Sequence, residues 1–228
     1  DVEGMRSAPP PAAAGRRRRA DHRARLEERL VAGDEGGAWA GVEAALTSSL
    51  DPPELYHEVL LPAMRSIGDR WAAGELTVAD EHQASVIAAR IVGRLGPRFT
   101  HPGRRRGTIV LGSAPGDQHT LPTAFLADLL RDRNFRVIDL GANTPLESFV
   151  EAVVEPPEVV AVGVCVTSPE IAPAAAEVAT ALHRASDVPV VVGGSAVESA
   201  EAATALGSDG FAAGSHEVVD LFVTLAAR

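Results

Sequence analysis

The stretch Thr108-Ile-Val-Leu-Gly-Ser-Ala-Pro-Gly-Asp-Gln-His-Thr-Leu-Pro122 decides the fold. It begins with an apolar, β-branched run, continues through a segment with proline and glycine, and ends on a proline of the kind that occupies first helical turns. Strand, loop and helix in this order form the repeating unit of a parallel α/β sheet. The loop also carries two side chains that can take part in binding or catalysis, Asp117 and His119.

Further apolar runs follow downstream and alternate with helical stretches. They occupy residues 135–140, 159–166 and 188–192, with a weaker run at 210–213. The pattern predicts a Rossmann-like (flavodoxin-like) domain over residues 108–228, with a five-stranded parallel sheet covered on both faces. Ligands of such sheets bind beyond the carboxyl ends of the strands. We therefore expect the functional loops to begin near Ser113, Gly141, Val166 and Gly193.

The N-terminal third shows helical rather than strand periodicity. Across residues 20–96 the apolar residues recur at spacings of three and four, with breaks near 33–37, 51–53 and 74–77, which predicts a four-helix bundle. Pro52 and Pro53 mark the third helix, and Thr77 with Asp80 forms a capping box that opens the fourth. Residues 97–107 have the composition of a linker. Residues 1–19 lack periodicity, and we expect a disordered tail.

Composition excludes several classes of function. All basic residues other than histidine are arginine, so the lysine of a P-loop and the Schiff-base lysine of pyridoxal enzymes are missing. The single cysteine, Cys165, excludes a disulfide framework and lies in an apolar run, where we expect it to be buried. The net charge of −10 argues against a nucleic-acid partner. No apolar run is long enough for a membrane span, and we expect a soluble, cytoplasmic protein.

The Asp117-x-His119 pair suits a metal-binding imidazole. Gly116 lets the loop bring the ring over the sheet edge, and a carboxylate two residues earlier can accept the proton of its other nitrogen. Such a contact fixes the tautomer that a metal requires. The pair alone also fits a helix-capping Asp117 beside a solvent-exposed His119, so the context decides.

The context resembles the cobalamin-binding domain of methionine synthases, corrinoid carriers and B12-dependent photoreceptors. Its motif is D-x-H-x-x-G, followed by a hydroxyl residue and a G-G pair. The resemblance implies that His119 is the lower axial ligand of cobalt and that Asp117 tunes it. Pro122 replaces the last glycine of the motif, which removes an N–H donor and adds a ring. The positions that match the binding site for the benzimidazole tail are Thr167, Ser168, Gly193 and Gly194.

A second motif lies in the helical region. Trp71 is followed after nine residues by Glu81 and His82, a W-x9-E-H pattern that resembles the upper-face motif of B12-dependent photoreceptors related to light-responsive MerR-type repressors. The resemblance implies that adenosylcobalamin lies between the two domains, with Trp71 and Glu81 against its adenosyl group and His82 as the upper cobalt ligand after light. Alone, Trp71 fits a core tryptophan and His82 a surface residue, but the two motifs together favour the functional interpretation.

The sequence thus predicts a cobalamin-dependent light sensor, not an enzyme, in which photolysis of adenosylcobalamin switches conformation or oligomeric state. We expect a homo-oligomer with a light-dependent state and a downstream protein partner. No helix-turn-helix pattern precedes Ala20, so we expect a fragment or a standalone sensor. Standalone members, the photocobilin group, add a bilin. This implies biliverdin as a second chromophore, held non-covalently because Cys165 is expected to be buried, although no sequence feature indicates bilin binding.

Two alternatives stay open. The first is a corrinoid carrier that serves a methyltransferase system. It needs free access to the upper face of the corrin, and Trp71, Glu81 and His82 argue against that access. The second is a flavodoxin-like interaction module without a cofactor, in which His119 is incidental.

Overall fold

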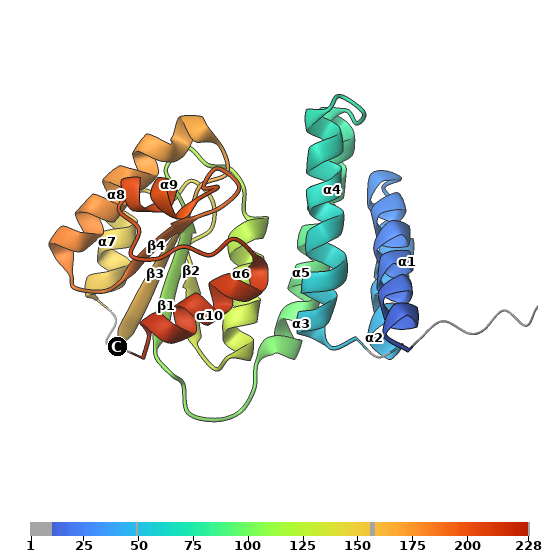
Figure 1. Cartoon of the computed structure of the whole chain (residues 1–228), viewed down its shortest axis with the longest axis horizontal. Coiled ribbons are helices and arrows are strands. Elements are labelled where there is room, and N and C mark those ends of the chain that lie inside the picture. The colour runs from blue at the N-terminus through green and yellow to red at the C-terminus, as the bar shows by residue number, and fades with distance from the viewer. Residues whose placement is uncertain (1–10, 49, 156–157, 228) are drawn as a thin grey trace, which may run out of the picture. The chain divides into compact units, whose positions relative to one another are not determined.

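The computed structural model describes residues 11–48, 50–155 and 158–227. The chain divides between Gly93 and Arg94 into a helical unit and a sheet-containing unit. Both are visible in Figure 1, and each is described by itself. No helix among the described residues combines the length and the apolarity that a membrane crossing needs.

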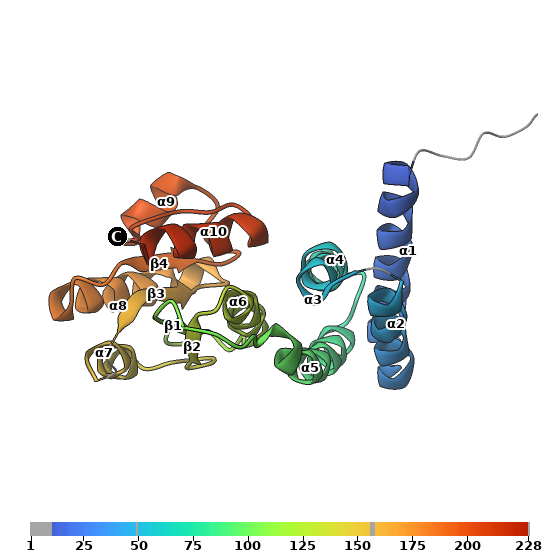
Figure 2. The same cartoon turned by 90° about the horizontal axis from the view of Figure 1, so that it is seen from below.

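The helical unit consists of helical segments joined by short loops. α1 and α2 lie side by side, and a single turn of π-helix, η1, joins α3 to α4 without a break (Figures 1 and 2). Because α3, η1 and α4 form one continuous helix, the described residues of this unit contain four helices in the predicted order. Their closure into a four-helix bundle stays a prediction. The bounds are α1 Pro11–Val31, α2 Glu35–Thr47, α3 Pro52–Leu55, η1 Tyr56–Leu60, α4 Leu61–Ala72 and α5 Val78–Leu95.

Local sequence signals explain where these helices begin. The side chain of Asp51 accepts from the backbone N–H of Glu54 at 2.8 Å, and Glu54 closes the capping box from the other side. Thr77 and Asp80 form the predicted capping box, with Thr77 N 2.8 Å from Asp80 Oδ2. α1 begins at Pro11, earlier than the expected helical start at residue 20, because a first-turn proline and three alanines favour a helix. Residues 1–10 of the expected disordered tail lie outside the described residues.

The sheet-containing unit is built on four parallel strands in the order β2-β1-β3-β4. The chain moves from β1 to β2 on one side and then crosses to β3 on the other, so the switch point lies between β1 and β3. α6 packs with α10, and α7 packs with α8. The bounds are β1 Thr108–Ser113, α6 Leu121–Asp132, β2 Arg136–Asp139, α7 Leu146–Val154, β3 Val159–Cys165, α8 Ala172–Ala185, β4 Val190–Gly193, α9 Ala200–Ala205 and α10 Ser215–Leu225.

The predicted fifth strand at residues 210–213 is wrong, because this segment forms no ladder with β4. Side chains from the preceding turn bond the outer edge of β4 instead. Val190 N donates to Asp209 Oδ2 at 2.7 Å, and Val192 N donates to Ser208 Oγ at 2.8 Å. The edge N–H groups are therefore satisfied without another strand.

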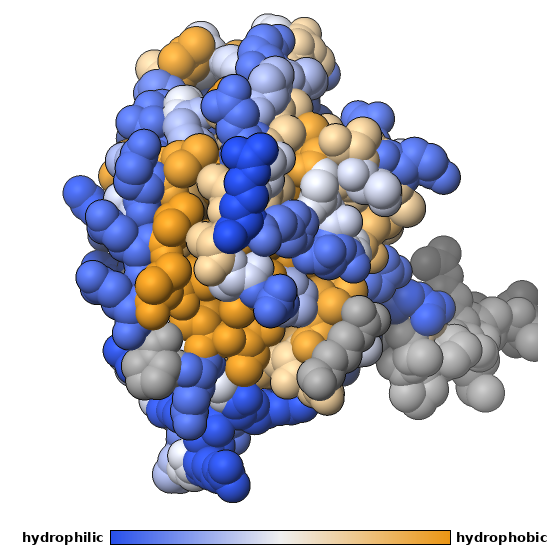
Figure 3. Space-filling view, turned by 90° about the vertical axis from the view of Figure 1, so that its left-hand side faces the viewer, coloured by the Kyte–Doolittle hydropathy of each residue, from blue (hydrophilic) through white to orange (hydrophobic). Residues whose placement is uncertain are grey.

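Apolar residues also reach the surface. Figure 3 shows orange apolar areas between blue hydrophilic ones on the side of the molecule that lies to the left in Figure 1. Val154, at the end of α7, is one of the exposed large apolar residues. Exposed apolar residues are ordinary on protein surfaces, and the functional argument rests on the carboxyl ends of the strands.

Candidate functional site

The loop between β1 and α6 is held in place at several points. The chain turns at Gly116, whose φ is +91°. Ser113 Oγ donates to the carbonyl of His119 at 2.7 Å, and Gly116 N donates to Asn143 Oδ1 at 2.7 Å. These contacts fix the conformation of the loop that carries Asp117 and His119.

Asp117 and His119 form a hydrogen-bonded pair across the surface of the loop. The carboxylate of Asp117 is fully buried, whereas the His119 side chain is 62% exposed. Nδ1 of His119 lies 2.8 Å from Asp117 Oδ1. An ionised carboxylate can only accept, so in the neutral form of the ring the proton lies on Nδ1 and Nε2 keeps its lone pair. Nε2 makes no hydrogen bond to any described residue, so in that form it is a nitrogen atom that a metal can bind.

Thr167, the second residue after β3, completes this arrangement. Its backbone N–H donates to Asp117 Oδ2 at 2.7 Å, and its hydroxyl donates to the same oxygen at 2.9 Å. Oγ1 also lies 2.8 Å from Nδ1 of His119. The loops after two neighbouring strands thus share one buried carboxylate, as the parallel-sheet prediction required.

The pKa values of the buried groups agree with this geometry. Burial alone would raise the pKa of Asp117, but the hydrogen bonds from His119 and Thr167 outweigh it and lower the pKa. Asp117 is therefore ionised at neutral pH. Burial, together with the charge of Asp117, raises the pKa of the Cys165 thiol to about 12. The thiol, which is partly rather than fully buried, stays protonated and is a poor nucleophile.

The predicted tail-binding residues gather beside this cluster. Gly194 has a φ of +123°, and a Cβ placed there would lie 2.3 Å from the carbonyl oxygen of Val166. The loops after β3 and β4 therefore meet backbone to backbone, which only glycine permits. A Cβ on Gly193 would face open space. The hydroxyl of Ser168 is hydrogen-bonded to Glu170.

Pro122 is compatible with this edge of the sheet. It is the exposed second residue of α6, a position where the helix has no intrahelical acceptor for an N–H group. The proline therefore does not interrupt the helix, although it removes one donor from the helix N-terminus.

The three residues of the second motif share one end of the α4–α5 hairpin. Trp71 lies in the last turn of α4 and is 46% exposed, which excludes the alternative of a core tryptophan. Glu81 accepts a bond of 2.6 Å from Ser85, and His82 is exposed, with Nε2 3.8 Å from Glu81 Oε2. His82 is the fifth residue of α5, just beyond the expected first turn, so the helix dipole affects it less than we expected.

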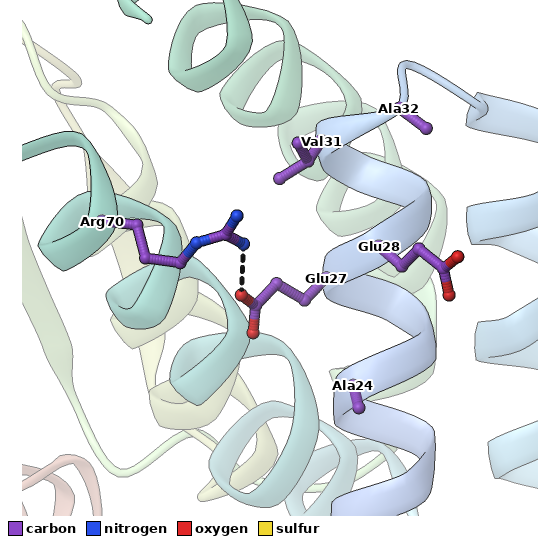
Figure 4. A pocket seen from close by; sticks show the side chains of 6 residues that line it. All are labelled: Ala24, Glu27, Glu28, Val31, Ala32 and Arg70. Atoms are coloured by element: carbon purple, nitrogen blue, oxygen red, sulfur yellow. Dashed lines mark hydrogen bonds and ion pairs between the residues drawn. The ribbon is translucent and has the colours of Figure 1, made fainter. Parts of the chain in front are cut away.

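The helical unit also contains a pocket of about 460 Å³ that none of the predicted site residues lines. Figure 4 shows Glu27 of α1 and Arg70 of α4 directed toward each other across it, with Oε1 and Nη1 2.9 Å apart. Ser66 donates to the same carboxylate oxygen at 3.0 Å. These bonds tie α1 to α4. The lining residues are Ala24, Glu27, Glu28, Val31, Ala32 and Arg70.

Sequence analysis missed the contributions of Ser113 and Asn143. Both side chains bond the backbone of the loop that carries the imidazole. The sequence does carry one relevant sign, because the GANTPL stretch after the second strand places an asparagine where a left-handed turn is common. Asn143 has a φ of +47°.

The parallel sheet carries at its switch point an imidazole that a buried carboxylate orients, and comparison with known proteins identifies the family to which this arrangement belongs. Residues 22–95 and 107–221 each match a family model described as a B12 binding domain. The second match spans half of the chain. The chain therefore belongs to the B12-binding-domain family, and cobalamin binding is confirmed.

Two kinds of relative bear on the function. A trimethylamine corrinoid protein of Methanosarcina barkeri is 29% identical over 154 residues, which cover 64% of this chain and 69% of the relative. The HTH-type transcriptional repressor CarH of Myxococcus xanthus is 36% identical over 107 residues, which cover 46% of this chain and 35% of the repressor. The solved monomethylamine corrinoid protein of Methanosarcina barkeri has the same fold, with a TM-score of 0.78 at 20% identity over 92% of this chain and 99% of that one.

These comparisons decide between several predictions. The trimethylamine relatives, which match over 69% of their length, are named as corrinoid proteins, in agreement with the prediction that this chain is not an enzyme. They favour the corrinoid-carrier alternative over the light sensor. The photoreceptor subfamily, the adenosyl form of the cofactor and biliverdin stay predictions of the resemblance. The module without a cofactor is excluded by the family membership.

Proposed function

We propose that this chain carries a cobalamin whose benzimidazole tail is displaced, with His119 Nε2 as the lower cobalt ligand, and presents its upper face to a methyltransferase partner. One observation carries the ligand assignment. Asp117 and Thr167 hold the protonated Nδ1, while Nε2 has no partner among the described residues. This is the tautomer and the orientation that a metal-binding imidazole needs.

The other loop residues have defined tasks in this proposal. Asp117 fixes the imidazole ring and increases its basicity. Thr167 and Ser168 offer hydroxyl groups to the displaced tail, and Gly193 and Gly194 allow its close approach to the backbone. The cofactor supplies a cobalt centre that can hold a methyl or an adenosyl group on its upper face.

The carrier function is supported by the relatives that resemble this chain over both domains. The trimethylamine and monomethylamine proteins are named as corrinoid proteins, and the sequence match to the first extends over 69% of its length. In a carrier the protein holds the corrin and a partner performs the transfer, so no catalytic residue of its own is needed. The partner we propose is therefore a methyltransferase.

A light sensor is the second candidate, and the exposed Trp71, Glu81 and His82 favour it. An exposed tryptophan and a carboxylate at the same end of the α4–α5 hairpin suit a nucleoside, whose base and hydroxyl groups need both kinds of contact. In this candidate the cofactor is adenosylcobalamin, and His82 holds cobalt from above once light has removed the adenosyl group. The 36% identity to the repressor supports it over part of the chain. A light-dependent homo-oligomer and biliverdin stay predictions of the resemblance.

Reconstitution of the whole chain separates the two candidates. The protein is loaded in the dark with methylcobalamin or adenosylcobalamin, and visible spectra are recorded before and after green light. A carrier binds the two forms with similar affinity and gives the same free-cobalamin product as solution photolysis. A sensor prefers the adenosyl form and gives a new, stable photoproduct. If neither form binds, or if His119→Ala leaves affinity and spectrum unchanged, the ligand assignment is wrong.

A further inference from the structure

We propose that Asn143, in the loop after β2, is a positioning residue that sets the Asp117–His119 pair before the cofactor arrives. The proposal rests on the proposed function, because it concerns the same cobalt ligand. Asn143 makes two contacts with the ligand loop. Its Oδ1 accepts from Gly116 N at 2.7 Å, and its backbone N donates to the carbonyl of Asp117 at 2.6 Å.

The two contacts bracket the peptide unit that joins Gly116 to Asp117. The first fixes the N–H at the start of Gly116, and the second fixes the carbonyl at the end of Asp117. Gly116 has a φ of +91°, which glycine permits but does not enforce. Without further contacts, this turn would be free to adopt many conformations. The neighbouring pair of bonds, Thr144 N to Ser113 O at 3.0 Å and Ser113 N to Gly141 O at 2.8 Å, anchors the base of the loop and not its tip. At the tip, Asp117 N donates to Ala114 O at 3.0 Å and Ser113 Oγ bonds the carbonyl of His119, and Asn143 is the residue of the loop after β2 whose side chain bonds this turn.

The backbone of Asn143 suits this task. Its φ of +47° lies in the left-handed region, where asparagine is tolerated better than most residues. That conformation lets the N–H and the side-chain oxygen of one residue both bond the facing loop. These two bonds of Asn143 go to Gly116 and Asp117 and not to His119, so its effect passes through the orientation of the Asp117 carboxylate. The Asp117 oxygens must face Nδ1 of His119 for Nε2 to keep its lone pair.

Three variants separate positioning from simple stabilisation. Asn143→Gly keeps the left-handed conformation available and removes the side-chain acceptor. Asn143→Asp restores an oxygen acceptor at the same place. Asn134→Gly is the matched control, because Asn134 also has a positive φ, of 64°, and lies in the turn before β2, outside the site loops.

The experiment uses the full chain and two readouts. Nitrogen-15 NMR of the histidine rings, without cofactor, reports the tautomer of His119, and titration with hydroxocobalamin reports affinity. We expect Asn143→Gly to lose the uniform Nδ1–H tautomer and to bind about tenfold more weakly, as outer-shell changes at metal ligands do. We expect its melting temperature to match that of Asn134→Gly, and Asn143→Asp to recover both readouts.

Two results would overturn the proposal. In the first, Asn143→Gly keeps the wild-type tautomer and affinity. In the second, Asn143→Gly loses stability and affinity together and Asn143→Asp recovers neither, and this result indicates a purely structural role. Failure of the proposed function gives a different pattern, in which His119→Ala binds hydroxocobalamin like the wild type. The tautomer is measured without the cofactor, so it tests the role of Asn143 in that case too.

Discussion

Nδ1 of His119 lies 2.8 Å from Oδ1 of Asp117, and this short contact joins a largely exposed ring to a fully buried carboxylate. Thr167 bonds the same carboxylate, so the orientation of the ring depends on the loop after β3 as well as on the loop after β1. Burial of the carboxylate keeps its lone pairs from water. The exposed edge of the ring, which carries Nε2, can then serve a ligand that arrives from solvent.

Replacement of Asp117 by asparagine should change how stability depends on pH. The folded-state pKa of Asp117 is lowered from its ordinary value of 3.8, so its stabilising contribution is complete above that value and disappears as the pH falls through the lower folded pKa. The difference in unfolding free energy between wild type and Asp117→Asn should therefore be largest near neutral pH and shrink in acid. Urea titrations of the cofactor-free protein measure it. A constant difference from neutral pH to acid would show that the charge of Asp117 contributes nothing.

Adjacent glycines should respond differently to alanine. Gly194→Ala places an alanine at a positive φ, where its Cβ would clash with the Val166 carbonyl. We therefore expect a loss of about 1–3 kcal/mol in unfolding free energy and weak cobalamin binding. Gly193→Ala meets open space, so the protein should keep its stability while cobalamin binding weakens. Thermal melts and cobalamin titrations of both variants provide the comparison. Unchanged cobalamin affinity in Gly193→Ala would remove this residue from the tail-binding set.

Trp71→Ala tests whether the helical unit recognises a nucleoside. If the chain is a sensor, the variant should lose affinity for adenosylcobalamin by about tenfold and keep its affinity for methylcobalamin, because only the first presents an adenine ring to an aromatic face.

His82→Ala should bind adenosylcobalamin in the dark but form no stable photoproduct. His183→Ala, whose histidine pairs with Asp209 at the far edge of β4, is the control. Equal behaviour of all variants toward both cofactors would leave the carrier function as the account of this protein.

The sequence predicted most of the sheet-containing unit, because buried parallel strands are continuous apolar runs and their carboxyl ends must meet at one edge. This is why Asp117 and Thr167, fifty positions apart, could be placed in one site. The sequence could not exclude the fifth strand. Side chains of Ser208 and Asp209 bond the edge of β4 in its place, and no local sequence pattern predicts these bonds. The same limit hid Asn143, whose role depends on a long-range contact.

The exposure of Trp71 agrees with the functional interpretation that the two motifs together favoured, although Trp71 alone also fitted a core tryptophan. Trp71 ends an apolar stripe along α3 to α4, in which Leu55, Val59, Leu60 and Ile67 are buried and Met64 is half-buried. The last residue of such a stripe can leave the core where the helix ends and its neighbour turns away. Periodicity describes a face of a helix but not how far the covering neighbour extends.

Electron paramagnetic resonance of the protein loaded with cob(II)alamin tests the central claim most directly, because the unpaired electron of cobalt couples to the nitrogen of its axial ligand. We predict that labelling histidine with nitrogen-15 changes the splitting pattern of the wild type. His101→Ala, which removes a histidine that pairs with Asp132 away from the site loops, should show the same change, whereas His119→Ala should show none. A wild-type spectrum that keeps its nitrogen-14 splitting after histidine labelling would mean that the benzimidazole of the cofactor remains on cobalt, and it would contradict the assignment of His119.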